Sequence, residues 1–110
     1  MFVNEIVNRP TIYAGESLPL EFIVNKDGKT FPLASITIQF KLAVIGDTTS
    51  ILTKDNSKFI IQDNIATLTL LPSDTQNLSV GVHDYIVTFT DSVGNVDKKK
   101  GQIEVIADIV

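Results

Sequence analysis

Apolar and polar residues alternate with a period of two along most of this chain, and a helical period is almost nowhere present. The clearest run is residues 36–42, in which apolar residues from Ile36 to Leu42 alternate with polar ones. Such alternation is typical of a β-strand with one buried face. The same pattern predicts further strands at residues 10–13, 18–24, 51–53, 59–61, 66–70, 82–89 and 102–107.

Residues that favour turns separate these segments. Gly28 supplies a turn after residue 24, Asp63-Asn64 a tight hairpin, and residues 91–95 a further hairpin. Residues 72–78 form the one predicted helical turn, capped by Ser73 or Asp74. Because the connections are too short for crossover helices, the strands must be mainly antiparallel. The prediction is an all-β, immunoglobulin-like sandwich of about seven to eight strands, forming one domain over residues 1–110.

The aromatic residues fall mostly in the apolar phase of these strands and are expected in the core; they are Phe22, Phe40, Phe59, Tyr85 and Phe89. His83 shares the inward phase with Tyr85, whereas Val82 and Ile86 share the outward phase of the same strand. The single histidine is therefore expected to be a packing residue rather than a catalytic base.

Composition narrows the class of protein. The 110 residues contain 9 basic and 13 acidic side chains, for a net charge of −4, which disfavours binding to nucleic acid or to an anionic membrane. The chain has no cysteine, so no disulfide can join the two sheets, and packing alone must hold them. No secretory signal and no membrane-length apolar run are visible, so we expect synthesis in a cytoplasm.

The residues that usually carry chemistry are scarce. With one histidine and no cysteine, a histidine or thiolate metal site cannot be built within one chain. No serine has the surroundings of a nucleophile, and the glycines form no phosphate loop. Asp and Asn gather in turns without the spacing of a calcium loop, so a calcium site is disfavoured. We expect a protein that is not an enzyme and has no cofactor.

The outward apolar residues are the candidate interaction surface: Val82, Ile86, Ile106, Ile109 and Val110. Two interpretations of the chain end stay open. Either the tail binds a partner, or Ile106 completes the last strand and the tail folds back over the sandwich. Lys98–Lys100, near the start of that strand, are expected to protect an exposed sheet edge.

Several motifs along the chain together resemble one family. They are Gly15-Glu16 before an alternating strand, Lys26-Asp27-Gly28, Pro32–Ser35, Ala66–Leu70, Pro72–Thr75 with Leu78, Gly81 before the long strand, Asp91–Gly94, and Gly101–Val105 with Asp108. Over nearly its whole length the chain resembles the immunoglobulin-like domain at the N-terminus of phage baseplate upper proteins and related small tail or prophage proteins. Such domains commonly have Gly-x-Tyr where this chain has Gly81-Val82-His83; an imidazole can still donate to a backbone carbonyl there.

The resemblance implies a structural, non-enzymatic docking module of a phage or prophage virion, made in the cytoplasm of a bacterial host. Its partners would be other virion or tail proteins, and assembly with further copies of the chain is compatible with this role. The alternative is a cell-surface or secreted adhesion module that recognises carbohydrate or protein. A third hypothesis is an accessory domain of an enzyme.

Overall fold

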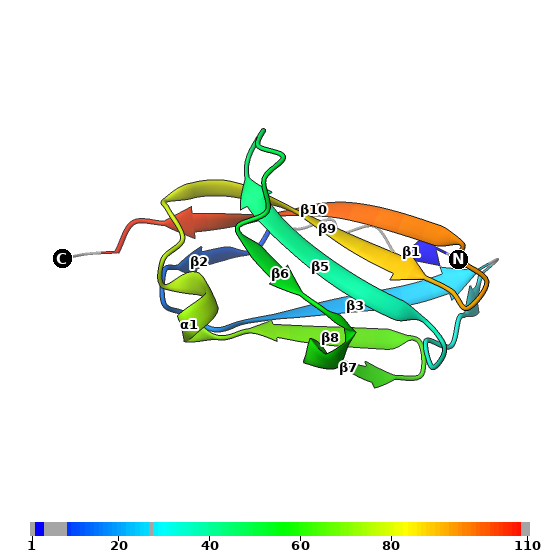
Figure 1. The fold of residues 1–110 in the computed structure, drawn as a ribbon. Coiled ribbons are helices and arrows are strands. Elements are labelled where there is room, and N and C mark those ends of the chain that lie inside the picture. Colours follow the sequence, from blue (N-terminus) through cyan, green and yellow to red (C-terminus); the bar gives the residue numbers. More distant parts are fainter. Residues whose placement is uncertain (1, 4–8, 27, 109–110) are drawn as a thin grey trace.

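The computed structural model describes residues 2–3, 9–26 and 28–108, and it consists mostly of β-strands arranged as two sheets packed face to face (Figure 1). The strands are β1 (Phe2–Val3), β2 (Thr11–Tyr13), β3 (Leu18–Lys26), β4 (Lys29–Thr30), β5 (Thr37–Val44), β6 (Leu52–Lys54), β7 (Phe59–Gln62), β8 (Ile65–Leu70), β9 (Gly81–Thr90) and β10 (Val96–Ile106). Two short helical turns, η1 (Asn56–Lys58) and α1 (Pro72–Thr75), connect them.

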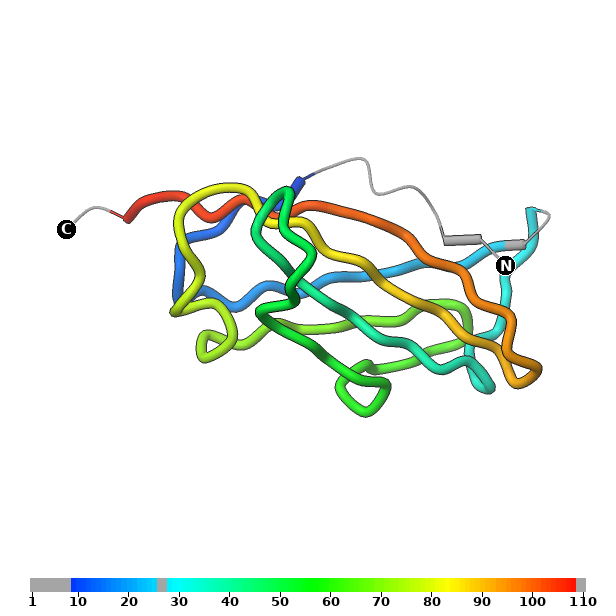
Figure 2. Tube along the Cα trace, turned by 45° about the horizontal axis from the view of Figure 1, so that its top comes forward, coloured from blue at the N-terminus to red at the C-terminus, as the bar shows by residue number. Residues whose placement is uncertain are grey.

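One sheet has the strand order β1-β3-β8-β7, with β4 paired to β3, and the other has the order β2-β10-β9-β5-β6. The pair β2–β10 is parallel, and every other ladder within the described residues is antiparallel. Figure 2 shows β5, β9 and β10 running side by side along the length of the second sheet. These three strands carry the longest ladders and provide the platform for the candidate site.

All eight segments with strand-like alternation form strands, but the described residues contain ten strands rather than seven or eight. The two additional strands, β1 and β4, are two residues long, and a period-two signal cannot be recognised over so short a run. The last strand begins at Val96, well before residue 102, because it pairs along its length with β9 from Val96↔Thr90 onward. Lys98–Lys100, expected near the start of this strand, lie within it.

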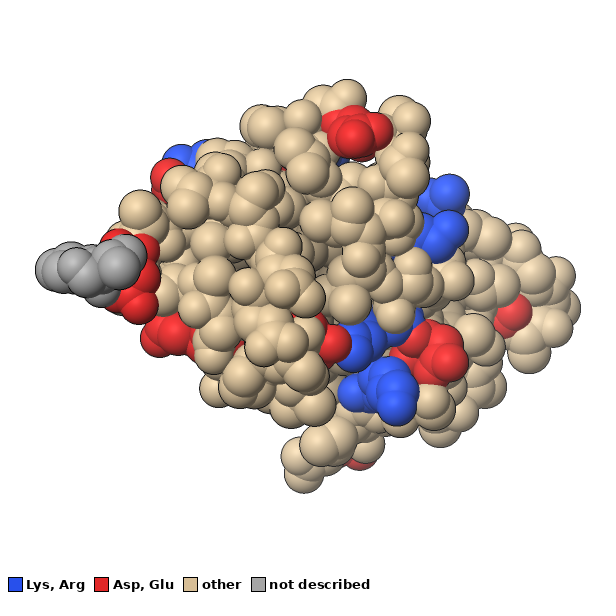
Figure 3. Space-filling model, turned by 60° about the vertical axis from the view of Figure 1, so that its left-hand side comes forward, with Lys and Arg blue, Asp and Glu red and all other residues tan. Residues whose placement is uncertain are grey.

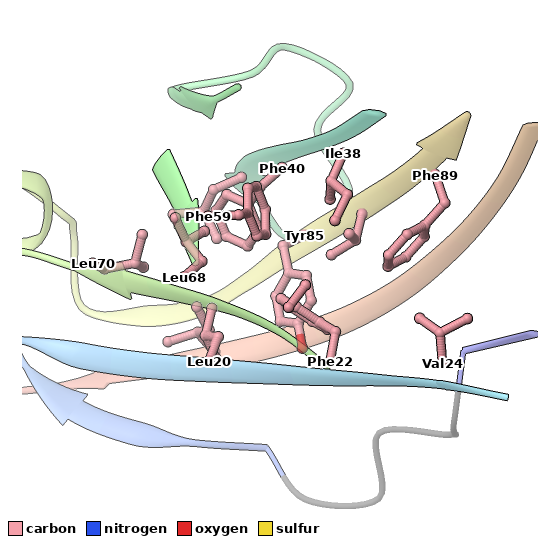
Figure 4. Close-up of a cluster of buried hydrophobic side chains, with 14 of the residues drawn as sticks. Leu20, Phe22, Val24, Ile38, Phe40, Phe59, Leu68, Leu70, Tyr85 and Phe89 are labelled. Atoms are coloured by element: carbon pink, nitrogen blue, oxygen red, sulfur yellow. The ribbon is translucent and has the colours of Figure 1, made fainter. Parts of the chain in front are cut away.

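The core lies between the sheets and is built from the inward phase of each strand (Figure 4). On β5 the buried and exposed residues alternate from Thr37 to Leu42, as the sequence predicts. The five aromatic residues expected in the core are all buried. In Figure 4 the Tyr85 side chain extends from β9 toward Phe22 on β3, so the two sheets meet through aromatic rings.

The turns use the residues that the sequence indicates. Asp63 takes a positive φ of 53° in the two-residue turn between β7 and β8. At α1 the cap comes from Asp74, whose carboxylate accepts a hydrogen bond from the Leu71 N–H at 2.8 Å. The Lys54 ammonium lies 2.7 Å from the same carboxylate, so one aspartate ties α1 to β6. Ser73 was the other predicted cap, and no hydrogen bond from its side chain caps α1.

Candidate functional site: the outer face of the second sheet

The outer face of the β2-β10-β9-β5-β6 sheet is built by the outward phase of three long strands. The ladder registers set its rows, because residues paired across an antiparallel ladder point to the same face. Ile86 lies between Lys41 of β5 and Lys100 of β10, and Asp84 lies between Ala43 and Gln102. Three regions follow one another along this face: an apolar region, a polar row and a basic region.

The apolar region lies where β9 begins and β10 ends, and we call it the apolar patch; it consists of Tyr13, Ile45, Val80, Val82 and Ile106. The Ile45 N–H donates to the Val82 carbonyl at 3.2 Å, which brings the end of β5 beside β9. Val80 and Ile106 flank the last ladder pair, Gly81↔Val105, and Tyr13 pairs with Ile106. Residues from all of these segments therefore adjoin one another.

The apolar patch is substantially exposed to solvent. Val80 is 66% exposed, Ile45 52% and Tyr13 39%, whereas Val82 and Ile106 are half-buried. Figure 3, which brings this end of the molecule forward, shows mostly uncharged atoms with the charged side chains in a few separate groups. On one side Arg9 and Glu104 form an exposed ion pair at 3.5 Å. An apolar surface with such a polar border is typical of an association site.

The polar row is centred on Asp84. Its carboxylate accepts hydrogen bonds from the Gln102 side chain at 3.0 Å and from the Gly46 N–H at 3.4 Å, and Lys100 lies 3.5 Å away. The Gln102 hydrogen bond, together with those from Gly46 and Lys100, outweighs the effect of burial and lowers the pKa of Asp84. Asp84 thus holds the loop after β5 against the sheet and separates Ile86 from the apolar patch.

The basic region is hollowed into a groove of about 520 Å³, which we call the lysine groove. Its floor includes Ile86 and Thr88 of β9, and its sides include Lys41 of β5 and Lys98 and Lys100 of β10. The loop from Gly46 to Ser50 forms part of its wall. Ile86 is 42% exposed within it.

Of the five residues predicted as an interaction surface, the three that the structure describes fall in two separate regions. Val82 and Ile106 meet in the apolar patch, whereas Ile86 lies in the lysine groove on the far side of Asp84. Ile106 completes β10, as one of the two interpretations of the chain end expects. Ile109 and Val110 lie outside the described residues.

Sequence reasoning missed Tyr13, Ile45 and Val80, which provide the most exposed part of the apolar patch. Tyr13 belongs to a three-residue strand, and the other two stand just outside strand ends, where alternation gives no signal. These residues come together through the alignment of β9 with β5 and β10. A single sequence does not reveal that alignment.

His83 does not contribute to this face. It is buried in the core, 1% exposed, and it lies opposite Val44 and Ile103 in the ladders. The suggested hydrogen bond from its imidazole to a backbone carbonyl is wrong, because neither ring nitrogen has a hydrogen-bond partner. His83 is a buried packing side chain, as its inward phase predicts.

The turn aspartates are engaged in their own loops. Asp47 accepts from the N–H groups of Thr48 and Thr49, and Asp91 accepts from those of Val93 and Asn95. The Asn95 side chain and these backbone donors lower the pKa of Asp91. Across residues 2–3, 9–26 and 28–108, no group of three or more His, Cys, Asp or Glu side chains is placed to hold a metal ion.

In the described part of the chain, no helix has both the length and the apolar character required to cross a membrane. The sequence matches no protein-family model and no curated protein.

Proposed function

We propose that this sandwich is immunoglobulin-like and acts as a non-enzymatic docking module that binds other proteins through the outer face of its second sheet. The strand order supports the immunoglobulin-like assignment. β1-β3-β8-β7 corresponds to strands A, B, E and D, and β10-β9-β5-β6 corresponds to G, F, C and C′. The short β2 adds to the second sheet in parallel with β10.

The apolar patch is the main observation that supports the docking role. Three of its side chains are between 39% and 66% exposed and come from separate segments of the chain. Exposed apolar side chains scattered singly need no explanation, but a contiguous group bordered by polar residues favours an association site. A stable interface needs roughly 800 Å² from each partner, so a partner would extend beyond the patch along the same face.

We propose further that the partners are components of a phage or prophage virion, of the tail or baseplate type. The support is the resemblance of the turn and strand motifs to baseplate upper proteins, together with the sandwich architecture that the resemblance implies. Association of several copies of the chain in a symmetric assembly is part of this proposal, since virion components are commonly symmetric oligomers.

The test is particle association. In the bacterial strain that carries the gene, phage particles are induced, purified on a density gradient and analysed for this chain by quantitative mass spectrometry. The proposal expects the chain to sediment with particles in a fixed ratio to the tail proteins. Recovery of the chain on the cell surface or in the medium, free of particles, would instead support the adhesion-module alternative.

A further inference from the structure

We propose that the lysine groove binds an acidic, extended segment of a partner protein. This inference rests on the docking role proposed above, and it adds the chemistry of the segment that one part of the face accepts. Three features support this proposal. They are the positive charge of the groove that no carboxylate of the described residues neutralises, the apolar residue on its floor, and the limited size of the basic region.

The positive charges of the groove are only partly neutralised within the described residues. Lys100 lies 3.5 Å from Asp84 with a side chain that is 63% exposed, and Lys41 and Lys98 form no ion pair in the described part of the chain. The two carboxylates of the groove are already engaged, Asp84 by Gln102 and the Gly46 N–H, and Asp47 by two N–H groups of its own loop. The lysine ammonium groups of the groove can therefore bind carboxylates of another molecule.

The floor of the groove favours a polypeptide over a simple anion. Ile86 is exposed directly between Lys41 and Lys100, which lie on the neighbouring strands. Adjacent strands are about 4.8 Å apart, so these two lysine backbones are separated by about 10 Å. An extended peptide places alternate side chains on one face about 6.8 Å apart. Acidic, apolar and acidic residues at every second position can thus reach one lysine, Ile86 and the other lysine.

Long polyanions fit the groove poorly. Its basic side chains are three lysines, and the chain as a whole carries a net charge of −4, which repels an extended array of phosphates. A short acidic segment needs only the local charge and the cavity of about 520 Å³. The Thr48 hydroxyl and the Gln39 amide, which also line the groove, can form hydrogen bonds with the backbone of the bound segment.

The probe is a fluorescein-labelled peptide that contains two copies of the sequence Glu-Ser-Leu-Ser-Glu, and the matched control replaces each Glu by Gln. Fluorescence anisotropy measures binding to the whole chain at low and at high salt. We expect the acidic peptide to bind several-fold more tightly than the Gln peptide, and its affinity to fall as salt screens the charges. Amide resonances of Lys41, Ile86 and Lys98 should shift on titration.

The double substitution K41E/K98E should weaken binding of the acidic peptide by about tenfold or more. The control K29E/K58E changes the net charge equally, and neither of its residues lines the groove; it should leave affinity within about twofold. Equal effects of the two variants would overturn the proposal, as would equal binding of the Gln peptide. Binding of polyphosphate through these lysines, without binding of the peptide, would also overturn it. Thermal unfolding checks that both variants fold.

Failure of this inference and failure of the docking role are distinguishable. If peptide binding is absent but the chain still sediments with particles, the groove inference is wrong and the docking role stands. If the peptide binds as expected but the chain is never found with particles, the virion assignment is wrong and the groove is a recognition site of another assembly.

Discussion

The ring of Tyr85 lies edge-on to the ring of Phe22, with centroids 6.1 Å apart and planes at 71°, and this contact joins the two sheets. The Phe40 ring also packs against Tyr85, with ring centroids 5.2 Å apart. In antibody domains a disulfide and a tryptophan occupy the centre of the sandwich. This chain has neither cysteine nor tryptophan, and an aromatic cluster fills the centre instead.

Gly101 is required by the position of Tyr85. The two residues pair across the β9–β10 ladder, and a Cβ at residue 101 would lie 2.3 Å from Tyr85 Cζ. We therefore expect Gly101→Ala to destabilise the fold by about 2–4 kcal/mol, because the buried ring would have to shift against Phe22 and Phe40. Urea unfolding measures the change. In a Tyr85→Leu variant, Gly101→Ala should lower the free energy of unfolding much less than it does in the wild type. An equal loss in both would contradict the proposed clash.

Burial raises the pKa of Tyr85 to about 12. Its unfolded pKa is near 10, so burial of the neutral phenol contributes its full stability below pH 10 and loses it as the pH rises through 12. The loss should approach about 3 kcal/mol, from two pKa units at 1.36 kcal/mol each. Tyrosinate absorbance in a Tyr13→Phe variant isolates Tyr85. Titration of the folded protein near pH 10 would show that the phenol is not buried.

His83 should be replaceable without loss of stability. Its ring is buried and both nitrogens are without hydrogen-bond partners, so the side chain bears a desolvation cost with no compensating bond. His83→Leu, of similar volume, is expected to be neutral or to stabilise the fold by about 1 kcal/mol. The measurement is the free energy of unfolding in urea. A loss of 2 kcal/mol or more would indicate that the imidazole makes an essential polar contact.

Asp74 should contribute to stability at neutral pH. Burial opposes its ionisation, but the Lys54 ammonium and the Leu71 N–H outweigh burial and lower the pKa. A depressed folded pKa gives stability that is present above the unfolded pKa near 3.9 and is lost as the pH falls through the folded value. We expect Asp74→Ala to cost about 1–2 kcal/mol at pH 7. The cost should shrink as the pH falls through the folded pKa of Asp74, and a cost independent of pH would contradict the ion pair.

The sequence predicted the strands, the core and the turns well, because each depends on local alternation or on a few turn residues. Phe40 and Tyr85 could be assigned to the core from their phase alone. Residues at strand ends could not be assigned to a surface, since the apolar patch depends on how β9 is aligned with its neighbours. Ile45 adjoins Val82 only through that alignment. The alternation of β9 does place Asp84 between Val82 and Ile86, but it does not show that Gln102, the Gly46 N–H and Lys100 hold its carboxylate there.

One comparison of two variants can show whether the outer face of the second sheet docks the chain onto a larger assembly. Val82→Glu places a charge in the apolar patch, and Thr69→Glu places the same charge on the outer face of the other sheet. Both variants, first shown to fold by urea unfolding, are expressed in the host, and their amounts in purified phage particles are measured against wild type. We expect Val82→Glu to be depleted at least about tenfold and Thr69→Glu to be retained. Retention of both variants, or equal loss of both, would contradict the docking role.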